Sequence, residues 1–337
     1  MKTAMFQEPK EGKKVLCGLC CHRCLIGDGK RGICGVRENR DGVLYSLVYD
    51  KVIARNIDPI EKKPLFHFQP GSTSYSIATP GCNFHCKHCQ NADISQLPHD
   101  RSGMILGEEA TPASIVEAAL RHRCSSISYT YTEPTIYFEL ALDTARLAAE
   151  AGLKNVFVTN GYITPEALKV IRPYLHAANI DLKGFRDEFY RQVCGAKLQP
   201  VLDSIKLYKD YGIWIEITTL VIPGHNDSDE DLNGIARFIR SAGENIPWHV
   251  SRFHPTYKLT DKPITPIATL KRARTIGFNA GLRYVYEGNI PGEGEDTMCW
   301  KCGKTLIERI GFTVEMNVIE SGKCPHCGEM IDGVWER

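Results

Sequence analysis

The chain has 337 residues, of which 43% are hydrophobic and 24% are charged. This composition excludes a disordered protein and suits one large α/β domain with small additions. The 41 basic and 40 acidic residues leave a formal charge of +1 with no basic block, so we expect no nucleic-acid partner. We also expect a cytoplasmic protein with no membrane partner, because the sequence contains neither a long apolar run nor a signal-peptide core.

The fourteen cysteines are the unusual part of the composition, and most of them fall in three groups. In a cytoplasmic chain such groups indicate metal ligands or redox centres rather than disulfides. Cys124 and Cys194 stand alone, and we expect them to be inert packing residues. The grouping predicts four segments, which are a cysteine-rich segment at 1–40, a connection at 41–74, a core at 75–290 and a second cysteine-rich segment at 291–337.

The first group lies near the start of the chain and has the spacing C-x2-C-x3-C-x9-C, with Cys21 as an extra thiol. Its members are Cys17, Cys20, Cys24 and Cys34. Four thiolates can hold zinc or an auxiliary iron-sulfur cluster that relays electrons. The spacing favours neither alternative over the other.

The core alternates between β-rich and amphipathic segments. Strands are expected at 74–79, 127–132, 155–159, 179–182, 213–222, 248–253 and 282–286. Helices are expected at 111–124, 135–151, 164–176, 186–211, 228–242 and 265–280. Repeated βα units predict a parallel sheet, and their number favours a full or partial (β/α) barrel, with an open doubly wound sheet as the alternative.

The second cysteine group directly follows the first strand of this core. Cys82, Cys86 and Cys89 have the spacing C-x3-C-x2-C, so three thiolates can converge from one short loop. A [4Fe-4S] cluster held by three cysteines has one iron without a protein ligand, which can bind a small molecule. The alternative is a zinc site completed by His85 or His88.

Polar residues follow the other strands at the same edge, where barrel enzymes place their active sites. As cofactor-binding residues we favour Glu133, Asn160, Asp181 and Lys183, and the catalytic candidates are Glu216, Arg252 and His254. Carboxylates suit an ammonium group or ribose hydroxyls, whereas Lys183 or Arg252 suits a carboxylate. The structural alternatives are a helix cap at Glu133, an Asx turn at Asp181 and a solvated Lys183. His67 is expected to be packed or solvated rather than a ligand.

The third group closes the chain with two C-x2-C-G motifs. Its members are Cys299, Cys302, Cys324 and Cys327. This arrangement is typical of a four-cysteine zinc ribbon, and zinc is favoured over an iron-sulfur cluster. A segment of this size buries little core, so the metal would stabilise its fold.

Several motifs along the chain together resemble those of one superfamily. They are CGLCCHRC, GKRGICGVREN, DPIEKKPLFHFQPGS, CNFHCKHCQNADISQ, TYTEPT, VTNGY, NIDLKGF, HVSRFHPTYKL and the terminal cysteine motifs. The chain resembles the radical SAM superfamily, in particular the radical SAM component of the AmmeMemoRadiSam system, which is related to pyruvate formate-lyase activating enzymes. Two departures are His88, where the superfamily often has an aromatic residue, and Tyr131-Thr132 where many members have a glycine pair.

The resemblance implies an enzyme with a partial (β/α) barrel. S-adenosylmethionine (SAM) would chelate the open iron of a [4Fe-4S] cluster on Cys82, Cys86 and Cys89, near Asp181 and Lys183, and be cleaved reductively to a 5′-deoxyadenosyl radical. That radical would abstract hydrogen from a substrate, which we expect to be a small molecule.

Alternative functions are an activase acting on a protein glycine and, in another class, a zinc-only binding module. The implied partners are an electron donor such as ferredoxin or flavodoxin, with Memo-like and AMMECR-like companion proteins.

Overall fold

The computed structural model describes residues 1–290 and 292–336 of the chain. Its centre is an eight-stranded sheet with the order β16-β15-β14-β13-β12-β11-β9-β8. The strands are β8 (Ala54–Pro59), β9 (Thr73–Ala78), β11 (Ser126–Tyr129), β12 (Lys154–Thr159), β13 (Ala177–Asp181), β14 (Trp214–Val221), β15 (Trp248–Arg252) and β16 (Val285–Gly288). All neighbouring strands are parallel except the pair of β8 with β9.

The strand order follows the order of the chain without reversal, as in a (β/α) barrel that is open between β8 and β16. A doubly wound sheet would reverse its strand order, so that alternative is wrong. The predicted parallel strands are all present, with ends that differ by a few residues. One such difference is at 130–132, where a turn with positive φ at Tyr131 replaces the expected end of a strand.

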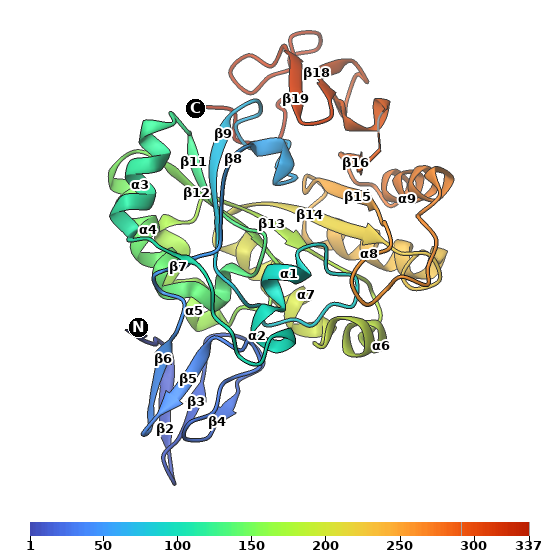
Figure 1. Ribbon diagram of the computed structural model, residues 1–337. Helices are drawn as coiled ribbons and strands as arrows, with labels where there is room; N and C mark the ends of the chain where they lie inside the picture. The colour runs from blue at the N-terminus through green and yellow to red at the C-terminus, as the bar shows by residue number, and fades with distance from the viewer. Residues whose placement is uncertain (291, 337) are drawn as a thin grey trace.

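Helices connect the parallel strands, and α4, α7 and α9 pack on them (Figure 1). The long helices are α3 (Pro112–Arg121), α4 (Phe138–Glu150), α5 (Pro165–Ile171), α7 (Leu198–Asp210), α8 (Asp229–Ala242) and α9 (Ile267–Asn279). Thr111, Thr164 and Ser228 cap three of them by accepting a backbone N–H with their hydroxyls. None of the helices within the described residues is long and apolar enough to span a membrane.

Short helical segments interrupt several connections. They are α1 (Ala92–Ser95), α2 (Leu97–Asp100), α6 (Asp187–Phe189), the 3₁₀ turns η1 (Ile60–Lys62), η2 (Pro134–Tyr137), η3 (Arg172–Tyr174) and η5 (Glu293–Glu295), and the π-helix η4 (Tyr190–Cys194). The helical region expected at 186–211 is therefore three elements, namely α6, η4 and α7. Gly195, with φ +74°, separates η4 from α7.

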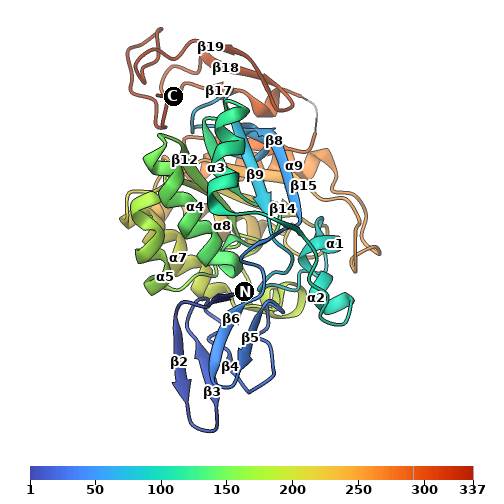
Figure 2. The same ribbon diagram turned by 60° about the vertical axis from the view of Figure 1, so that its left-hand side comes forward.

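Small antiparallel sheets lie at the two ends of the molecule (Figures 1 and 2). The N-terminal ones contain β1 (Lys2–Thr3), β6 (Val43–Ser46) and β5 (Arg37–Arg40), and β2 (Gln7–Lys10), β3 (Lys14–Cys17) and β4 (Leu25–Ile26). The C-terminal one contains β17 (Thr297–Met298), β18 (Thr305–Ile310) and β19 (Thr313–Asn317), and a further pair joins β7 (Lys51–Val52) to β10 (Glu108–Glu109). The stretch 41–74, expected as a connection, supplies β6 to an N-terminal sheet and β8 to the central sheet.

Candidate functional site

The cysteine loop begins directly after β9 and ends at α1, at the carboxyl end of the sheet. The π-helix η4 holds its backbone, since the N–H groups of His85 and Lys87 donate to the carbonyls of Cys194 and Val193, both at 2.9 Å. Gly81 opens the loop with φ +98°, and a Cβ there would lie 2.6 Å from a methyl of Val36. Only glycine fits this close approach. The loop is therefore clamped between η4 and the N-terminal segment.

Each cysteine of the loop has a donor near its sulfur. The backbone N–H of Phe84 lies 3.4 Å from Cys82 Sγ, and Ser95 Oγ lies 3.1 Å from Cys89 Sγ. A hydrogen bond from Cys194, with the attraction of Lys183, lowers the pKa of the buried Cys86 thiol. Burial raises the pKa of Cys82 and of Cys89. Bound metal would replace the protons of these thiols, because a coordinating thiol is deprotonated.

The spacing of these sulfurs fits a cluster better than a single ion. Within the described residues, Cys82, Cys86 and Cys89 do not form a set whose sulfurs all lie within 4.8 Å of one another. A four-iron cluster binds each thiolate through a different iron and holds the sulfurs apart. His88 Nδ1 and Asn83 Nδ2 are buried without a hydrogen-bond partner among the described residues. Such orphaned polar atoms beside a thiol loop indicate a missing ligand.

Cys194 is an unexpected neighbour of this loop. Its sulfur lies within 4.8 Å of Cys86 Sγ and of a ring nitrogen of His88, and all three residues are buried. Cys194 is buried, as expected of a packing residue, but the π-helix η4 also brings it to the cysteine loop, a contact that the sequence does not predict. Single π turns are frequent at functional sites. The other lone cysteine, Cys124, is buried, and the pKa of its thiol is raised by burial.

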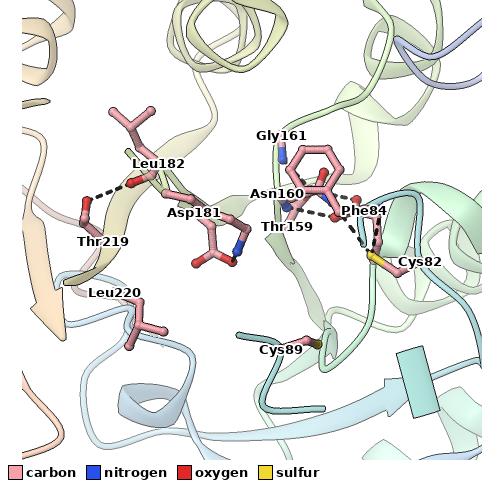
Figure 3. A network of polar contacts seen from close by, with 12 residues as sticks. Cys82, Phe84, Cys89, Thr159, Asn160, Gly161, Asp181, Leu182, Thr219 and Leu220 are labelled. Carbon is pink, nitrogen blue, oxygen red and sulfur yellow. Dashed lines mark hydrogen bonds and ion pairs between the residues drawn. The ribbon is translucent and has the colours of Figure 1, made fainter. Parts of the chain in front are cut away.

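Asn160 lies beside the first loop cysteine, Cys82 (Figure 3), and Glu133 accepts a hydrogen bond from the backbone of Asn160. The buried carboxylate of Glu133 accepts hydrogen bonds from the backbone and hydroxyl of Thr135, the hydroxyl of Thr159 and the backbone of Asn160, at 2.6–3.0 Å. These hydrogen bonds lower the pKa of Glu133, but burial raises it by more, so the pKa is raised overall. Asn160 Nδ2 lies 2.7 Å from Asn83 Oδ1 and 3.9 Å from Cys82 Sγ. Both residues thus hold the loop in place.

Asp181 ends β13 and lies across the strand ends from Cys82 (Figure 3), and Lys183 follows two residues later. Their side chains form an ion pair at 2.8 Å, and the Asp181 carboxylate is one-third exposed. Burial lowers the pKa of Lys183, but attraction to Asp181 and to the thiols of Cys86 and Cys194 outweighs it, so the pKa is raised overall. The site therefore presents an ammonium and an accessible carboxylate beside the cysteine loop.

Glu216 lies at the other end of the sheet, near the start of β14. Its carboxylate accepts hydrogen bonds from the backbone of Phe66 and His67, from Trp214 Nε1 and from His249 Nε2, at 2.7–3.1 Å. The structure thus gives Glu216 an anchoring role far along the strand from the loop. Glu216 therefore does not lie at the carboxyl edge, where the sequence places it together with the other candidates. His67 is fully buried in the same network, as a packed residue.

Arg252 and His254 follow β15 at the carboxyl edge. Arg252 Nε donates to the Thr265 carbonyl at 2.9 Å. His254 is exposed and lines a cavity of about 910 Å³ together with Gln90, which is adjacent to Cys89. Asn289 and the turn between β18 and β19 form other parts of its wall. Only His254 of these two residues therefore lines a cavity next to the cysteine loop.

The C-terminal cysteines form a compact set. The sulfurs of Cys299, Cys302, Cys324 and Cys327 all lie within 4.8 Å of one another. Cys299 Sγ is 3.7 Å from Cys327 Sγ, and Cys302 Sγ is 3.8 Å from Cys324 Sγ. A tetrahedron with zinc-sulfur bonds of about 2.3 Å has edges of about 3.8 Å. These separations suit one tetrahedral ion.

The N-terminal cysteines are also brought together, but less tightly. Cys17, Cys20, Cys24 and Cys34 line one small, largely enclosed cavity. Among the residues that the structure describes, no three of these four sulfurs form a set within 4.8 Å. Cys21 points elsewhere, with its Sγ 3.2 Å from the carbonyl of Ile163.

The Radical SAM superfamily profile matches residues 76–239. An uncharacterized protein of Methanocaldococcus jannaschii is 52% identical over 336 residues, covering 98% of this chain and 99% of that protein. The pyruvate formate-lyase-activating enzyme of Clostridium pasteurianum is 22% identical over 198 residues, covering 54% of this chain and 80% of that enzyme.

Solved structures show the same fold. A radical SAM methyltransferase from Sphaerobacter thermophilus aligns with a TM-score of 0.51 at 16% identity, covering 66% of this chain and 68% of that one. SuiB of Streptococcus suis bound to its precursor peptide aligns with a TM-score of 0.51 at 16% identity, covering 68% of this chain and 51% of that one. The profile match, the cysteine loop after the first parallel strand and the shared fold agree, and the chain belongs to the radical SAM superfamily.

Proposed function

We propose that Cys82, Cys86 and Cys89 hold a [4Fe-4S] cluster at which SAM is cleaved reductively to methionine and a 5′-deoxyadenosyl radical. The observation that supports this most is the clamped three-cysteine loop, whose sulfurs are spaced too widely for one ion. When bound, the cluster supplies an open coordination site and an electron. The loop donors, Phe84 N–H and Ser95 Oγ, stabilise the negative charge on the sulfurs.

Asp181 and Lys183 are the residues that we propose to orient SAM. A cation is needed near the carboxylate of SAM, and Lys183 lies close enough to Cys86 to lower the pKa of that thiol. Asp181 is accessible enough to accept hydrogen bonds from ribose hydroxyls. Glu133 and Asn160 act indirectly, by holding the loop of Cys82.

The substrate side of the site is the cavity of about 910 Å³ lined by His254 and Gln90. This volume is that of a small-molecule site, which favours a small substrate over a protein glycine. An activase role stays the second proposal, motivated by the likeness to activating enzymes. A ferredoxin- or flavodoxin-type donor, Memo-like and AMMECR-like companions and a reducing cytoplasm complete the proposal. The C-terminal four cysteines would hold a structural zinc ion.

The test is SAM cleavage by anaerobically reconstituted protein with dithionite. We expect 5′-deoxyadenosine and methionine from the unaltered chain and neither product from the triple variant Cys82→Ala, Cys86→Ala, Cys89→Ala. Cleavage at an unchanged rate by the triple variant would contradict the proposal. Purified protein that contains only zinc, with no iron, would support the binding-module alternative, for which Cys86, His88 and Cys194 offer a compact ion site.

A further inference from the structure

The cavity lined by the N-terminal cysteines has apolar walls. Besides the four thiols, its lining includes Leu19, Ile26, Ile33 and Ile136. Arg37 supplies a buried cation, whose Nη1 lies 3.9 Å from Cys17 Sγ and which also pairs with Glu139. A metal centre with four thiolates carries negative charge, so a cation in contact with one of its sulfurs stabilises it.

The separation of the sulfurs distinguishes the two metals that four cysteines commonly bind. A tetrahedral zinc site requires sulfurs about 3.8 Å apart, as the C-terminal set shows. Within the described residues, no three of the N-terminal sulfurs lie within 4.8 Å of one another, although all four line one cavity. The sulfurs of Cys82, Cys86 and Cys89 likewise do not all lie within 4.8 Å of one another. The N-terminal sulfurs thus lack the compact arrangement of a single tetrahedral ion, which favours a multi-iron cluster.

A hydrogen bond joins the segment of the N-terminal cysteines to the SAM-cluster loop, which is the loop of Cys82, Cys86 and Cys89. His22 lies two residues from both Cys20 and Cys24, and Asn83 directly follows Cys82. His22 Nε2 lies 2.8 Å from the Asn83 carbonyl, and because a carbonyl only accepts, this nitrogen carries the proton. A short path of covalent bonds and this single hydrogen bond therefore connects the two cysteine sets.

Packing makes this junction rigid. The ring of Tyr162 lies 4.8 Å from that of His22 and 5.2 Å from that of Phe84, measured between centroids. Cys20 forms a β-bridge with Ile163, and the N–H of Cys21 donates to the Tyr162 carbonyl at 3.1 Å. Aromatic rings and backbone hydrogen bonds thus fill the space between the two loops.

We propose that Cys17, Cys20, Cys24 and Cys34 bind a [4Fe-4S] cluster that passes electrons through His22 and Asn83 to the cluster held by Cys82, Cys86 and Cys89. A low-potential one-electron donor protein reduces the N-terminal cluster and dissociates in its own oxidised form. The N-terminal cluster returns to its oxidised state when it transfers that electron to the second cluster. The same electron then breaks the S–C5′ bond of SAM. The relay role rests on the proposed function, whereas the metal assignment does not.

The metal assignment is tested in the variant Cys82→Ala, Cys86→Ala, Cys89→Ala, which lacks the ligands of the second cluster. After anaerobic reconstitution we expect about four irons and four sulfides per chain, with an electron paramagnetic resonance (EPR) signal on reduction. Adding Cys20→Ala and Cys24→Ala should remove this iron. Zinc in place of iron in the triple variant would overturn the assignment, whether or not the full chain cleaves SAM.

The relay is tested with His22→Ala in the otherwise unaltered chain. Metal content and both EPR signals should persist. Reduction of the SAM cluster by a ferredoxin-type donor, followed by freeze-quench EPR, should slow several-fold. His122→Ala, at an exposed histidine, is the matched control and should reduce at the normal rate. An unchanged rate in His22→Ala would overturn the relay, and the metal assignment would then depend on the first experiment alone.

Discussion

The two four-cysteine sets of this protein differ in spacing, exposure and surroundings. The C-terminal set is compact, and Cys302 and Cys327 are exposed. In the N-terminal set no three sulfurs among the described residues lie within 4.8 Å of one another, and Cys17 and Cys34 are buried in an apolar cavity. The number of thiols is the same, so the distance between sulfurs and the groups around them decide which metal each set suits.

The sets also lie against opposite ends of the central sheet. The N-terminal set contacts the carboxyl end through His22, which bonds to Asn83 in the loop of Cys82, Cys86 and Cys89. The C-terminal segment packs on Phe66, Tyr284 and Tyr286, and Arg309 donates to the Phe66 carbonyl at 2.8 Å. Changes at the amino end should therefore affect stability, and changes at the carboxyl end should affect redox chemistry.

The largest effect is expected from Cys324→Ala, which removes one ligand of the compact set. Structural zinc contributes on the order of 10 kcal/mol to the folding of small domains. We therefore expect the zinc to be lost and the segment 297–336 to unfold, while the iron content stays unchanged. Metal analysis and limited proteolysis measure both. His326→Ala is the control, because His326 is exposed in the same loop and should leave the zinc bound. Loss of iron instead of zinc would contradict the assignment of the metals to the two ends.

The next effect is expected from Glu216→Ala, which removes the anchor of Phe66 and His67. Breaking a buried ion pair or its hydrogen bonds costs about 3–5 kcal/mol, and we expect this loss in the free energy of unfolding. Denaturant titration under anaerobic conditions measures it. Glu117→Ala, at a carboxylate that is 72% exposed on α3, is the control and should change stability little. If Glu216→Gln folds normally but no longer cleaves SAM, the anchoring role is wrong.

A smaller effect should follow a change of pH through His67. Burial lowers the pKa of His67 from 6.5 to about 4, so the unfolded chain binds a proton between these values that the folded chain does not. Stability must then fall as the pH drops below 6.5, by up to about 1.4 kcal/mol per pH unit. Unfolding free energies at pH 6.5 and 5.0 should differ by about 2 kcal/mol more in the unaltered chain than in His67→Gln. An identical pH dependence in both would show that another group is responsible.

Sequence reasoning identified the carboxyl end of the sheet well and the amino end poorly. The cysteine loop and the strand-helix alternation depend on spacing within short segments, so they could be predicted locally. The sequence places Glu216 on a strand, but it does not predict the segment 60–72 that packs against it. That segment depends on distant contacts, such as the Asp332 carbonyl 2.6 Å from His67 Nδ1. No local pattern announces a contact between such distant segments.

Cys194 shows the same limit at the carboxyl end. It is far along the chain from Cys86, and it reaches the loop only because the segment before it forms a π-helix. By contrast, Phe84 and Ser95 lie within or beside the cysteine motif, where a search for sulfur donors can find them. The strand β8 lies within the stretch 41–74, for which the sequence predicts only a connection.

The smallest effect is expected from Cys194→Ala at the carboxyl end. The Cys194 thiol lies within 4.8 Å of Cys86 Sγ and lowers the pKa of the Cys86 thiol, and donors beside cluster sulfurs stabilise the reduced, more negative state. Removing this donor should lower the midpoint potential of the SAM cluster and leave iron content and stability nearly unchanged. EPR-monitored redox titration measures the shift, Cys194→Ser should restore part of it, and Cys124→Ala, at a second buried thiol, should cause none. If Cys194→Ala instead loses iron, Cys194 is a ligand, and the loop of three cysteines does not hold its metal alone.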